Sequence, residues 1–484
     1  MISNLSARSR SFLVPALSAV VAVIAIPHQT ILAGPLTPPP GPVTSTPGAE
    51  ARIALNTTNT PGDATAKFVI TQPGSYYLTA NLDAGATNGV SAIRIAANDV
   101  TIDLNGFVVR GAGSNTAPLI LVVGSGAGTN KGNVTIRNGT LRDSGGDGLN
   151  ALTNSAENIR LYDIVSRSNL GSGFVLTNRS FVQNCTAQNN GNLGFNATSA
   201  SNCTFINCTA DANTNNGIAG GNATVLQGCL STANGAFGFL IGNSSSATGC
   251  VARANVSTEW FISNNCTLLN CTADNAGTSG TSFLINDNCS LTNCSAVGGV
   301  GFACYSGGNG GTYISCSASG GVAGFSSGAR SSFSNCSAAN STGNGFSIGT
   351  ASSITNCSST NNAGFGIIAT TGSTVSNCSV YLNGSDGIRV SNGTSVINNT
   401  ARDNAGFGII CTGGNNRVEG NSATSNTGGG ISVLGGCIVV RNYAAGQGAD
   451  DFFIAGNNAV GQIFDVSAAA TTITTGNSFA NFKF

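Results

Sequence analysis

The chain repeats one pattern of apolar and polar positions every 20 to 23 residues. The residue three positions before each repeat's marker is apolar, and most repeats carry apolar residues ten and twelve positions after it. Alternating inward positions of this kind predict short β-strands. Each repeat therefore predicts three short strands around a shared core. The markers are Cys185, Cys208, Cys229, Cys250, Cys271, Cys294, Cys316, Cys336, Cys357 and Cys378.

The frame continues beyond the cysteines. The same step reaches Asn399, Asn421 and Asn442 downstream, and Ile164 and Gly139 upstream. A fixed step over such a length is typical of a solenoid, in which each repeat packs only on its neighbours. We therefore expect one all-β domain of about sixteen stacked coils with capped ends instead of several globular domains.

Two asparagine columns accompany the marker. The marker and the residue three positions before it are both expected to point inward. On one straight strand, residues three positions apart point to opposite faces, so the chain must bend between them. Asparagine tolerates a left-handed backbone, and we predict a bend at the first column, with hydrogen bonds between its members in neighbouring coils. The first column, directly before the marker, is Asn138, Asn184, Asn207, Asn270, Asn293, Asn335, Asn356, Asn377 and Asn398. The second column, five positions after the marker, leads into glycine-rich turns and is Asn169, Asn190, Asn213, Asn234, Asn255, Asn383, Asn404 and Asn426.

The N-terminus predicts an export signal. Arg8 and Arg10 precede the apolar stretch 12–26, and small residues near Ala33 suit cleavage. A membrane anchor is the alternative, but a span needs about 20 apolar residues. We expect a secreted protein, extracellular or periplasmic, without a membrane span after cleavage. The expected segments are a signal peptide (1–33), a proline-rich linker (34–50), an N-terminal cap with lead-in strands (51–98), the solenoid (99–462) and a C-terminal cap (463–484).

Composition excludes several functional classes. Cleavage of the signal would remove His28, the only histidine, and would leave 17 basic and 19 acidic residues. Without histidine, serine–histidine and cysteine–histidine catalysis and histidine-containing zinc sites are excluded. Without a basic excess, a nucleic-acid partner is not expected.

The cysteines present a choice between disulfides and thiols. Sixteen cysteines in an exported protein suggest disulfides. However, stacked side chains of an in-register ladder keep their Cβ atoms farther apart than the roughly 3.5–4.5 Å of a relaxed disulfide. We expect mostly buried free thiols, with Cys266 and Cys289 as the best pair for a bridge.

Four short motifs give the chain a family resemblance. They are QPGSYYL at 72–78, VTIDLNG at 100–106, NVTIRNG at 133–139 and ANF at 480–482. With the repeat, they make residues 70–484 similar to the right-handed parallel β-helix (pectin-lyase-like) superfamily, which includes pectate lyases, polygalacturonases and many exported bacterial proteins. The resemblance implies a single-stranded right-handed parallel β-helix. The family's catalytic motifs Arg-x-Pro-x-x-Arg, Trp-x-Asp-His and Gly-His-Gly are missing, so the resemblance does not carry an activity over.

Charge is concentrated in 131–167, and the site candidates come from this segment. Arg142, Asp143, Asp147 and Arg167 are the candidate catalytic or binding residues, and Asp143 and Asp147 are also candidate calcium ligands because carboxylate oxygens suit calcium. Arg142 and Arg167 share one outward position in successive repeats. A basic group beside carboxylates suits an acidic sugar, whereas the alternative is a solvated patch of salt bridges. No other cofactor is expected.

Two functions remain open. The first is a non-catalytic envelope or extracellular protein whose polar sheet face binds a polysaccharide or cell-surface glycan. The second is a polysaccharide lyase, epimerase or hydrolase that acts on an acidic polysaccharide, with its site on 131–167 and the preceding segment 111–132. We favour the first. Trp260 is a candidate sugar platform, but a packed core residue is the preferred interpretation. The sequence does not determine the oligomeric state.

Overall fold

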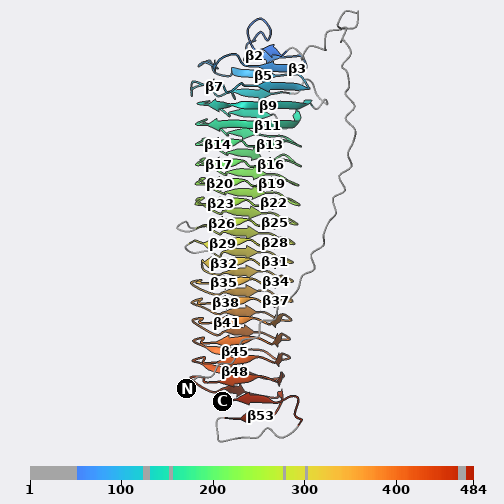
Figure 1. The fold of residues 1–484 in the computed structure, drawn as a ribbon, viewed down its shortest axis with the longest axis vertical. Coiled ribbons are helices and arrows are strands. Elements are labelled where there is room, and N and C mark those ends of the chain that lie inside the picture. The colour runs from blue at the N-terminus through green and yellow to red at the C-terminus, as the bar shows by residue number, and fades with distance from the viewer. Residues whose placement is uncertain (1–51, 124–130, 152–155, 276–279, 300–302, 467–475) are drawn as a thin grey trace, which may run out of the picture. The chain divides into compact units, whose positions relative to one another are not determined.

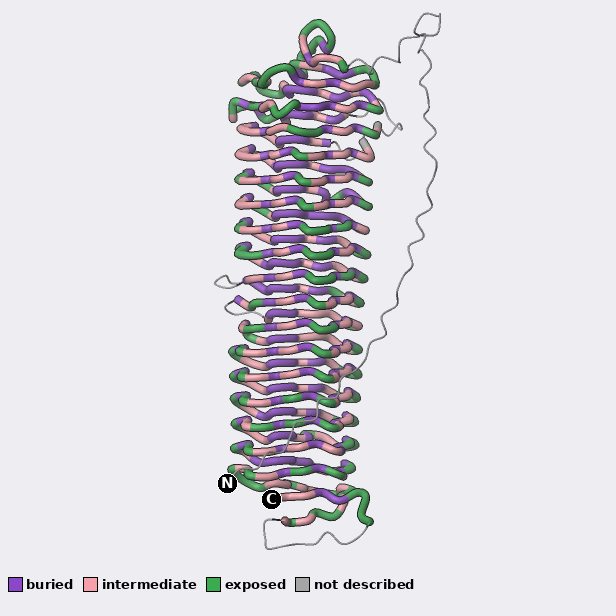
Figure 2. Tube along the Cα trace, viewed as in Figure 1, coloured by how far each residue is buried: buried purple, intermediate pink, exposed green. Residues whose placement is uncertain are grey.

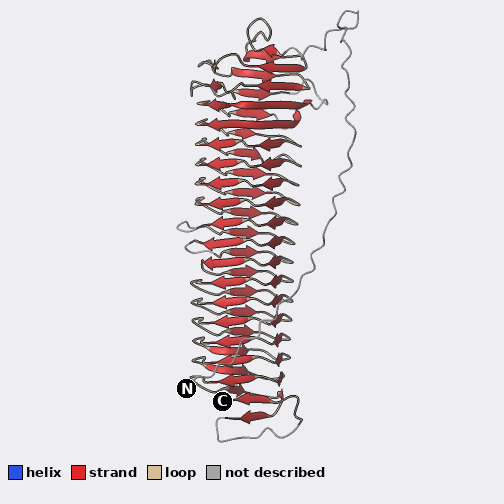
Figure 3. Cartoon of the chain, viewed as in Figure 1, coloured by secondary structure: helices blue, strands red, loops and turns tan. Residues whose placement is uncertain are grey.

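A computed structural model describes residues 52–123, 131–151, 156–275, 280–299, 303–466 and 476–484. The chain divides into two units, 1–50 and 51–484, and the first unit, with the predicted signal peptide and linker, lies outside the described residues. The second unit is an all-β parallel solenoid of about 19 turns (Figures 1 and 3). Within the described ranges, no helix is long and apolar enough to cross a membrane.

Three rows of strands run along the described part of the solenoid, and strands of successive coils pair in parallel. The first row contains β1 (Ile53–Ala54), β3 (Gly74–Tyr77), β6 (Val100–Asp103), β13 (Phe181–Gln183), β16 (Thr204–Ile206), β19 (Val225–Gln227), β22 (Ser246–Thr248), β25 (Thr267–Leu269), β28 (Ser290–Thr292), β31 (Thr312–Ile314), β34 (Ser332–Ser334), β37 (Ser353–Thr355), β40 (Thr374–Ser376), β43 (Ser395–Ile397), β46 (Arg417–Glu419), β49 (Ile438–Val440) and β52 (Ala459–Val460). The second row contains β4 (Leu82–Asp83), β7 (Val108–Arg110), β14 (Thr186–Gln188), β17 (Thr209–Asp211), β20 (Leu230–Thr232), β23 (Val251–Arg253), β26 (Thr272–Asp274), β29 (Ser295–Gly298), β32 (Ser317–Gly320), β35 (Ser337–Ala339), β38 (Ser358–Thr360), β41 (Ser379–Tyr381), β44 (Thr400–Arg402), β47 (Ser422–Thr424), β50 (Tyr443–Ala445), β54 (Asn481–Lys483) and β53 (Ile463–Asp465).

Two long strands, β9 (Lys131–Arg142) and β11 (Ala156–Arg167), run through both of these rows. The third row contains β2 (Ala66–Ile70), β5 (Ser91–Ile95), β8 (Ile120–Val122), β10 (Leu149–Ala151), β12 (Phe174–Val175), β15 (Phe195–Ala197), β18 (Ile218–Gly220), β21 (Phe239–Ile241), β24 (Trp260–Ile262), β27 (Phe283–Ile285), β30 (Tyr305–Gly307), β33 (Phe325–Ser327), β36 (Phe346–Ile348), β39 (Ile367–Ala369), β42 (Ile388–Val390), β45 (Phe407–Cys411), β48 (Gly429–Val433) and β51 (Phe452–Ile454).

The solenoid has more turns than the sequence predicts, about 19 against about sixteen. The difference arises at the N-terminal end, where strands within 51–98 already pair in parallel with the coils that follow: β1 pairs with β3, and β2 pairs with β5. These coils lack the cysteine and asparagine markers, so the repeat frame did not count them.

The core follows the predicted inward positions (Figure 2). Val182 and Phe195 are fully buried, as are their equivalents up to Val439 and Ile431, whereas Phe452 and Val460 in the last coil are partly exposed. In-register stacking brings aromatic rings face to face, as for Phe283 and Tyr305, whose ring centroids lie 4.9 Å apart. Trp260 is also fully buried, with centroids 4.1 Å from Phe239 and 6.1 Å from Phe283, so it packs in the core and offers no platform for a sugar.

The predicted bend occurs at the first asparagine column. Asn184 and Asn207 have φ of 54° and 51°, in the left-handed region, and their side chains are exposed. The prediction that asparagines of this column hydrogen-bond to one another is wrong. A hydrogen-bonded stack forms instead in the second column, whose side chains point inward and are buried.

The second column forms a buried amide ladder. Asn190 Nδ2 donates to Asn213 Oδ1 at 2.9 Å, and Asn213 Nδ2 donates to Asn234 Oδ1 at the same distance. The backbone N–H of Asn190 donates to the same Asn213 oxygen at 3.1 Å. An unpaired buried amide costs about 1–3 kcal/mol, so each coil depends on the oxygen that the next coil supplies.

The cysteines are buried free thiols, as predicted. Burial raises the pKa of Cys203 to about 11 and that of Cys304 to about 12, because the apolar surroundings disfavour the thiolate. Cys266 and Cys289 are not bridged, and the backbone N–H of Cys266 donates to Cys289 Sγ at 3.4 Å. The thiols therefore act as core packing and as weak acceptors between coils.

The ladder predicts that Asn213→Ala costs about 3 kcal/mol of local stability, because two donors of Asn190 lose their acceptor. Hydrogen exchange of the coils around Asn213 measures this loss. Asn207→Gly is the matched control, because Gly228 and Gly249 already stand at the equivalent exposed position with φ of 61°, and it should change exchange little. Equal effects of the two substitutions would refute the role of the ladder.

Candidate functional site

Three arginines occupy one outward position in three successive coils. Arg110 on β7 is the register partner of Arg142 on β9, and Arg142 is the register partner of Arg167 on β11. We call Arg110, Arg142 and Arg167 the arginine ladder. Strands pair about 4.8 Å apart, so the three guanidinium groups leave the sheet from adjacent positions. The next residue in the row is the uncharged Gln188.

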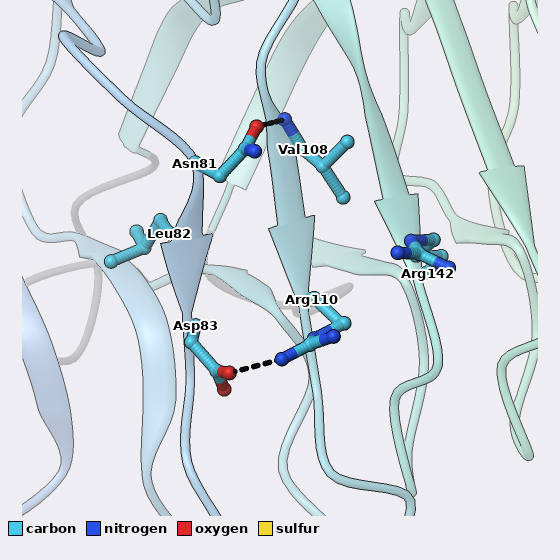
Figure 4. A pocket seen from close by; sticks show the side chains of 6 residues that line it. All are labelled: Asn81, Leu82, Asp83, Val108, Arg110 and Arg142. Atoms are coloured by element: carbon cyan, nitrogen blue, oxygen red, sulfur yellow. Dashed lines mark hydrogen bonds and ion pairs between the residues drawn. The ribbon is translucent and has the colours of Figure 1, made fainter.

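Two aspartates partly neutralise the arginine ladder. Asp83 on β4 is the register partner of Arg110, and its Oδ2 accepts a hydrogen bond from the Arg110 guanidinium at 2.7 Å (Figure 4). The hydrogen bond from Arg110 lowers the pKa of Asp83, and it raises the pKa of Arg110. Arg142 pairs with Asp143 at 3.2 Å, while Arg167 has no ion-pair partner in the described part of the chain. The group therefore carries three positive and two negative charges.

Shallow hollows adjoin the arginine ladder. One of about 200 Å³ is lined by Asn81, Leu82, Asp83, Val108, Arg110 and Arg142, whose side chains Figure 4 shows on neighbouring strands. The other, of about 340 Å³, includes Asp83, Arg110, Asp143 and the glycine-containing turn 111–113 among its lining. A Cβ atom on Gly111 would lie 2.6 Å from the backbone oxygen of Asp143, so this turn requires glycine to pack closely.

Asp147 serves the backbone. Its Oδ1 accepts the backbone N–H of Ser172 at 2.7 Å, and its Oδ2 accepts from Asn150 Nδ2 at 2.7 Å. Other coils use the same contact: Asn216 Oδ1 accepts from the Phe237 N–H at 3.0 Å, and Asn344 Oδ1 accepts from the Phe365 N–H at 2.9 Å. Asp147 is thus one of a series of turn residues that connect successive coils.

The structure brings two of the four candidates into direct contact, Arg142 and Asp143, and places Arg167 beside Arg142. The other charges of 131–167 are distributed over separate contacts. Arg137 pairs with Asp103 at 3.2 Å, Arg179 pairs with Glu157 at 3.0 Å, and Asn184 donates to Asp163 at 3.1 Å. Apart from Lys131, whose side chain is outside the description, the charged segment therefore does not converge on one pocket.

The sequence interpretation missed Asp83 and Arg110. Arg110 stands 32 residues before Arg142, well beyond the repeat step, so the frame did not align the two. The segment 111–132, interpreted as an insertion, contains β8, which pairs with β5 and β10 in the third row. Its residues 124–130 lie outside the described residues.

No group of three or more histidine, cysteine, aspartate or glutamate side chains that could hold a metal ion occurs within the residues described. Asp143 contacts Arg142, and Asp147 contacts Asn150 and the Ser172 backbone, so the two candidate calcium ligands have separate partners.

The turn role of Asp147 predicts that Asp147→Asn changes the free energy of unfolding by less than about 1 kcal/mol, because an amide oxygen can accept the Ser172 N–H. Asp147→Ala should cost about 2 kcal/mol, because that N–H loses its acceptor. Urea unfolding of both variants measures the difference. If Asp147→Asn lowers the free energy of unfolding as much as Asp147→Ala does, the charge of Asp147 matters and the turn role is not sufficient.

Comparisons with known proteins place this geometry in a family. Among curated proteins, none matches the sequence. Similar solved structures include the A-module of mannuronan C-5 epimerase AlgE4 from Azotobacter vinelandii, with 16% identity over 80% of this chain and 87% of that chain and a TM-score of 0.19. Pectate lyase Pel9A shows 13% identity over 67% of this chain and 72% of that chain, with a TM-score of 0.24.

The profile of the right-handed β-helix region matches residues 125–258 and 312–444, more than half of the chain. These matches span β9 to the coils just before the C-terminal strands, and they agree with the parallel pairing of successive coils. The chain therefore belongs to the right-handed β-helix family.

Proposed function

We propose that the protein is a secreted, non-catalytic binder of an acidic polysaccharide or cell-surface glycan, and that the ligand binds on the arginine ladder. The observation that carries the proposal is the in-register repetition of one guanidinium in three successive coils. Like charges at adjacent sheet positions destabilise the sheet. An anionic ligand lying across Arg110, Arg142 and Arg167 would remove this repulsion.

The arginines of the ladder can exchange their present ion pairs for contacts with a ligand. The side chains of Asp83 and Arg110 are about half exposed, at 52% and 51%, and exposed ion pairs contribute little stability. Arg142 pairs with Asp143, its own neighbour in sequence, and its buried Nε has no hydrogen-bond partner. Guanidinium groups bind carboxylates through two parallel hydrogen bonds, so a carboxylate or sulfate group of a glycan suits these side chains.

The arrangement favours a polymer over a small anion. The strands that carry the three arginines repeat along the solenoid axis at about 4.8 Å. A chain that carries regularly spaced acidic groups can contact several of them at once, and linked contacts strengthen binding. The open hollows of about 200 and 340 Å³ leave room for such a chain to pass along the surface.

Binding is preferred to the alternative of a lyase, epimerase or hydrolase. Each of these reactions needs a group that takes or delivers a proton near the sugar. The acids beside the ladder are Asp83 and Asp143, and each contacts an arginine. The hydrogen bond from Arg110 lowers the pKa of Asp83, which makes this carboxylate a weaker base.

The proposal predicts that the double variant Arg142→Gln, Arg167→Gln binds acidic oligosaccharides at least about tenfold more weakly, because charge-assisted hydrogen bonds contribute about 1.5–3 kcal/mol each when shielded and less when exposed. Glutamine is the natural next residue of this row, so the sheet should tolerate it. Calorimetric titration at low salt measures the affinity, and wild-type binding should weaken as salt rises.

The matched control is Arg253→Gln, because Arg253 belongs to the same row but has Thr232 and Asp274 as register partners, outside the arginine ladder. It should bind like the wild type. A glycan array would identify the ligand first, and an assay for unsaturated or shortened products would follow. Unchanged affinity in the double variant would contradict the site, and product formation would contradict the non-catalytic role.

A further inference from the structure

Glu259 is a fully buried carboxylate in the middle of the solenoid. It directly precedes β24, and its backbone pairs with both neighbouring coils: its N–H donates to Thr281 O at 3.2 Å, and its oxygen accepts from the Phe239 N–H at 2.9 Å. No basic side chain lies within ion-pair distance of Glu259 in the described ranges. The other buried carboxylates behave differently, since Asp103, Asp386 and Glu419 each pair with at least one arginine.

Glu259 terminates the amide ladder that runs through Asn169, Asn190, Asn213, Asn234 and Asn255. The backbone N–H of Asn255 donates to Glu259 Oε1 at 3.0 Å, and Asn255 Nδ2 donates to Glu259 Oε2. The next position of the column in the sequence is Ala276, which has no side-chain oxygen. Glu259 therefore supplies, from its own coil, the acceptors for Asn255 that an asparagine of the next coil supplies elsewhere in the ladder.

The second amide ladder ends on an uncharged residue instead of a carboxyl group. It runs through Asn383, Asn404 and Asn426 and ends at Gln447, whose Oε1 accepts the Asn426 N–H at 2.8 Å and Asn426 Nδ2 at 3.2 Å. Gln447 Nε2 donates to backbone oxygens, including Ala423 O. An uncharged amide is thus sufficient to end a ladder, and a carboxyl group at this place adds a dependence on protonation.

We propose that Glu259 is a proton-operated latch on the coil that contains β23 and β24, whose strand β23 pairs with β26 of the next coil. With its proton, the carboxyl group closes the amide ladder as a neutral group in the core. Without its proton, it leaves a negative charge in an apolar, fully buried place, and this coil opens more readily.

The surroundings of Glu259 favour the protonated form. The pKa of Glu259 is raised to about 7: burial has the largest effect, the two hydrogen bonds from Asn255 act against it, and the charge of Asp274 on β26 adds to it. Arg253 on β23 is exposed and makes no ion pair with Glu259. Trp260 of β24 and the residues stacked on it from the neighbouring coils, Phe239 and Phe283, do not titrate.

The sign of the pH dependence follows from this pKa. The ordinary value of 4.5 applies in the open coil, and the folded coil has the higher value of about 7. The folded coil therefore holds the proton more tightly, its stability is greatest below about pH 4.5, and the stability falls as the pH rises to about 7. Each unit of difference corresponds to a tenfold change, so the opening constant should rise by about 300-fold over the whole titration and by about 100-fold between pH 5 and pH 8.

Hydrogen–deuterium exchange of the full chain tests the latch. After correction for the intrinsic exchange rate, protection of peptides from β23 to β26 should fall by about 100-fold between pH 5 and pH 8, while peptides from β40 to β44 should change little. Glu259→Gln should abolish this dependence and keep protection at pH 8 near the wild-type level at pH 5. Glu157→Gln, the same change at an exposed ion pair, is the matched control and should leave the dependence intact.

A second variant tests the proposal even if Glu259→Gln fails to fold. Gln447→Glu places a carboxyl group at the end of the second ladder, and it should create a weaker pH dependence in peptides around β47 and β50, because Gln447 is only partly buried. Protection around β24 that changes no more with pH than protection around β41 would overturn the proposal. A pH dependence that persists in Glu259→Gln would overturn it as well.

Discussion

Within the amide ladders, each coil completes its buried hydrogen bonds with atoms of the next coil, except at the ladder ends. Asn190 illustrates the constraint, because both its backbone N–H and its side-chain amide donate to one oxygen of Asn213. Stacked coils also align their inward rings, as in the series Phe283, Tyr305, Phe325 and Phe346. A shift of register would break the amide pairs and the ring stacks together, so the repeat enforces strict alignment. Each of the two ladders must then end on a residue that supplies the last acceptors, and Glu259 and Gln447 provide these ends.

The same alignment has a consequence on the outer surface. A side chain repeated at one outward position stands directly beside its copies, so charges of one sign accumulate in rows. Arg110, Arg142 and Arg167 form such a row, and the opposing charges of Asp83 and Asp143 reduce the repulsion without cancelling it. In a chain with 8% charged residues, this concentration distinguishes the N-terminal coils from the regular middle. Scaffold and site therefore arise from one rule, in-register repetition, applied to inward amides and outward guanidinium groups.

The sequence predicts the fold well because the repeat is periodic and each period corresponds to one coil of the solenoid. The inward columns, the left-handed bend at Asn184 and the buried thiols all follow from spacing and residue type. It assigns the hydrogen-bonded stack to the wrong asparagine column, because spacing alone does not reveal which of two columns is buried. It misses Arg110 because 32 residues separate it from Arg142. The turn role of Asp147 and the burial of Glu259 depend on contacts between coils, which no local pattern records.

The central claim is that the regular coils form a scaffold and that ligand binding is confined to the arginine ladder. Hydroxyl-radical footprinting of the full chain, with and without an acidic oligosaccharide, tests this claim most directly because it reports every exposed side chain at once. We predict ligand-dependent protection on the outward residues of β4, β7, β9 and β11 and unchanged modification of the coils from β16 to β50. Protection spread over the middle coils, or bound oligosaccharide without protection of β7 and β9, would contradict the account.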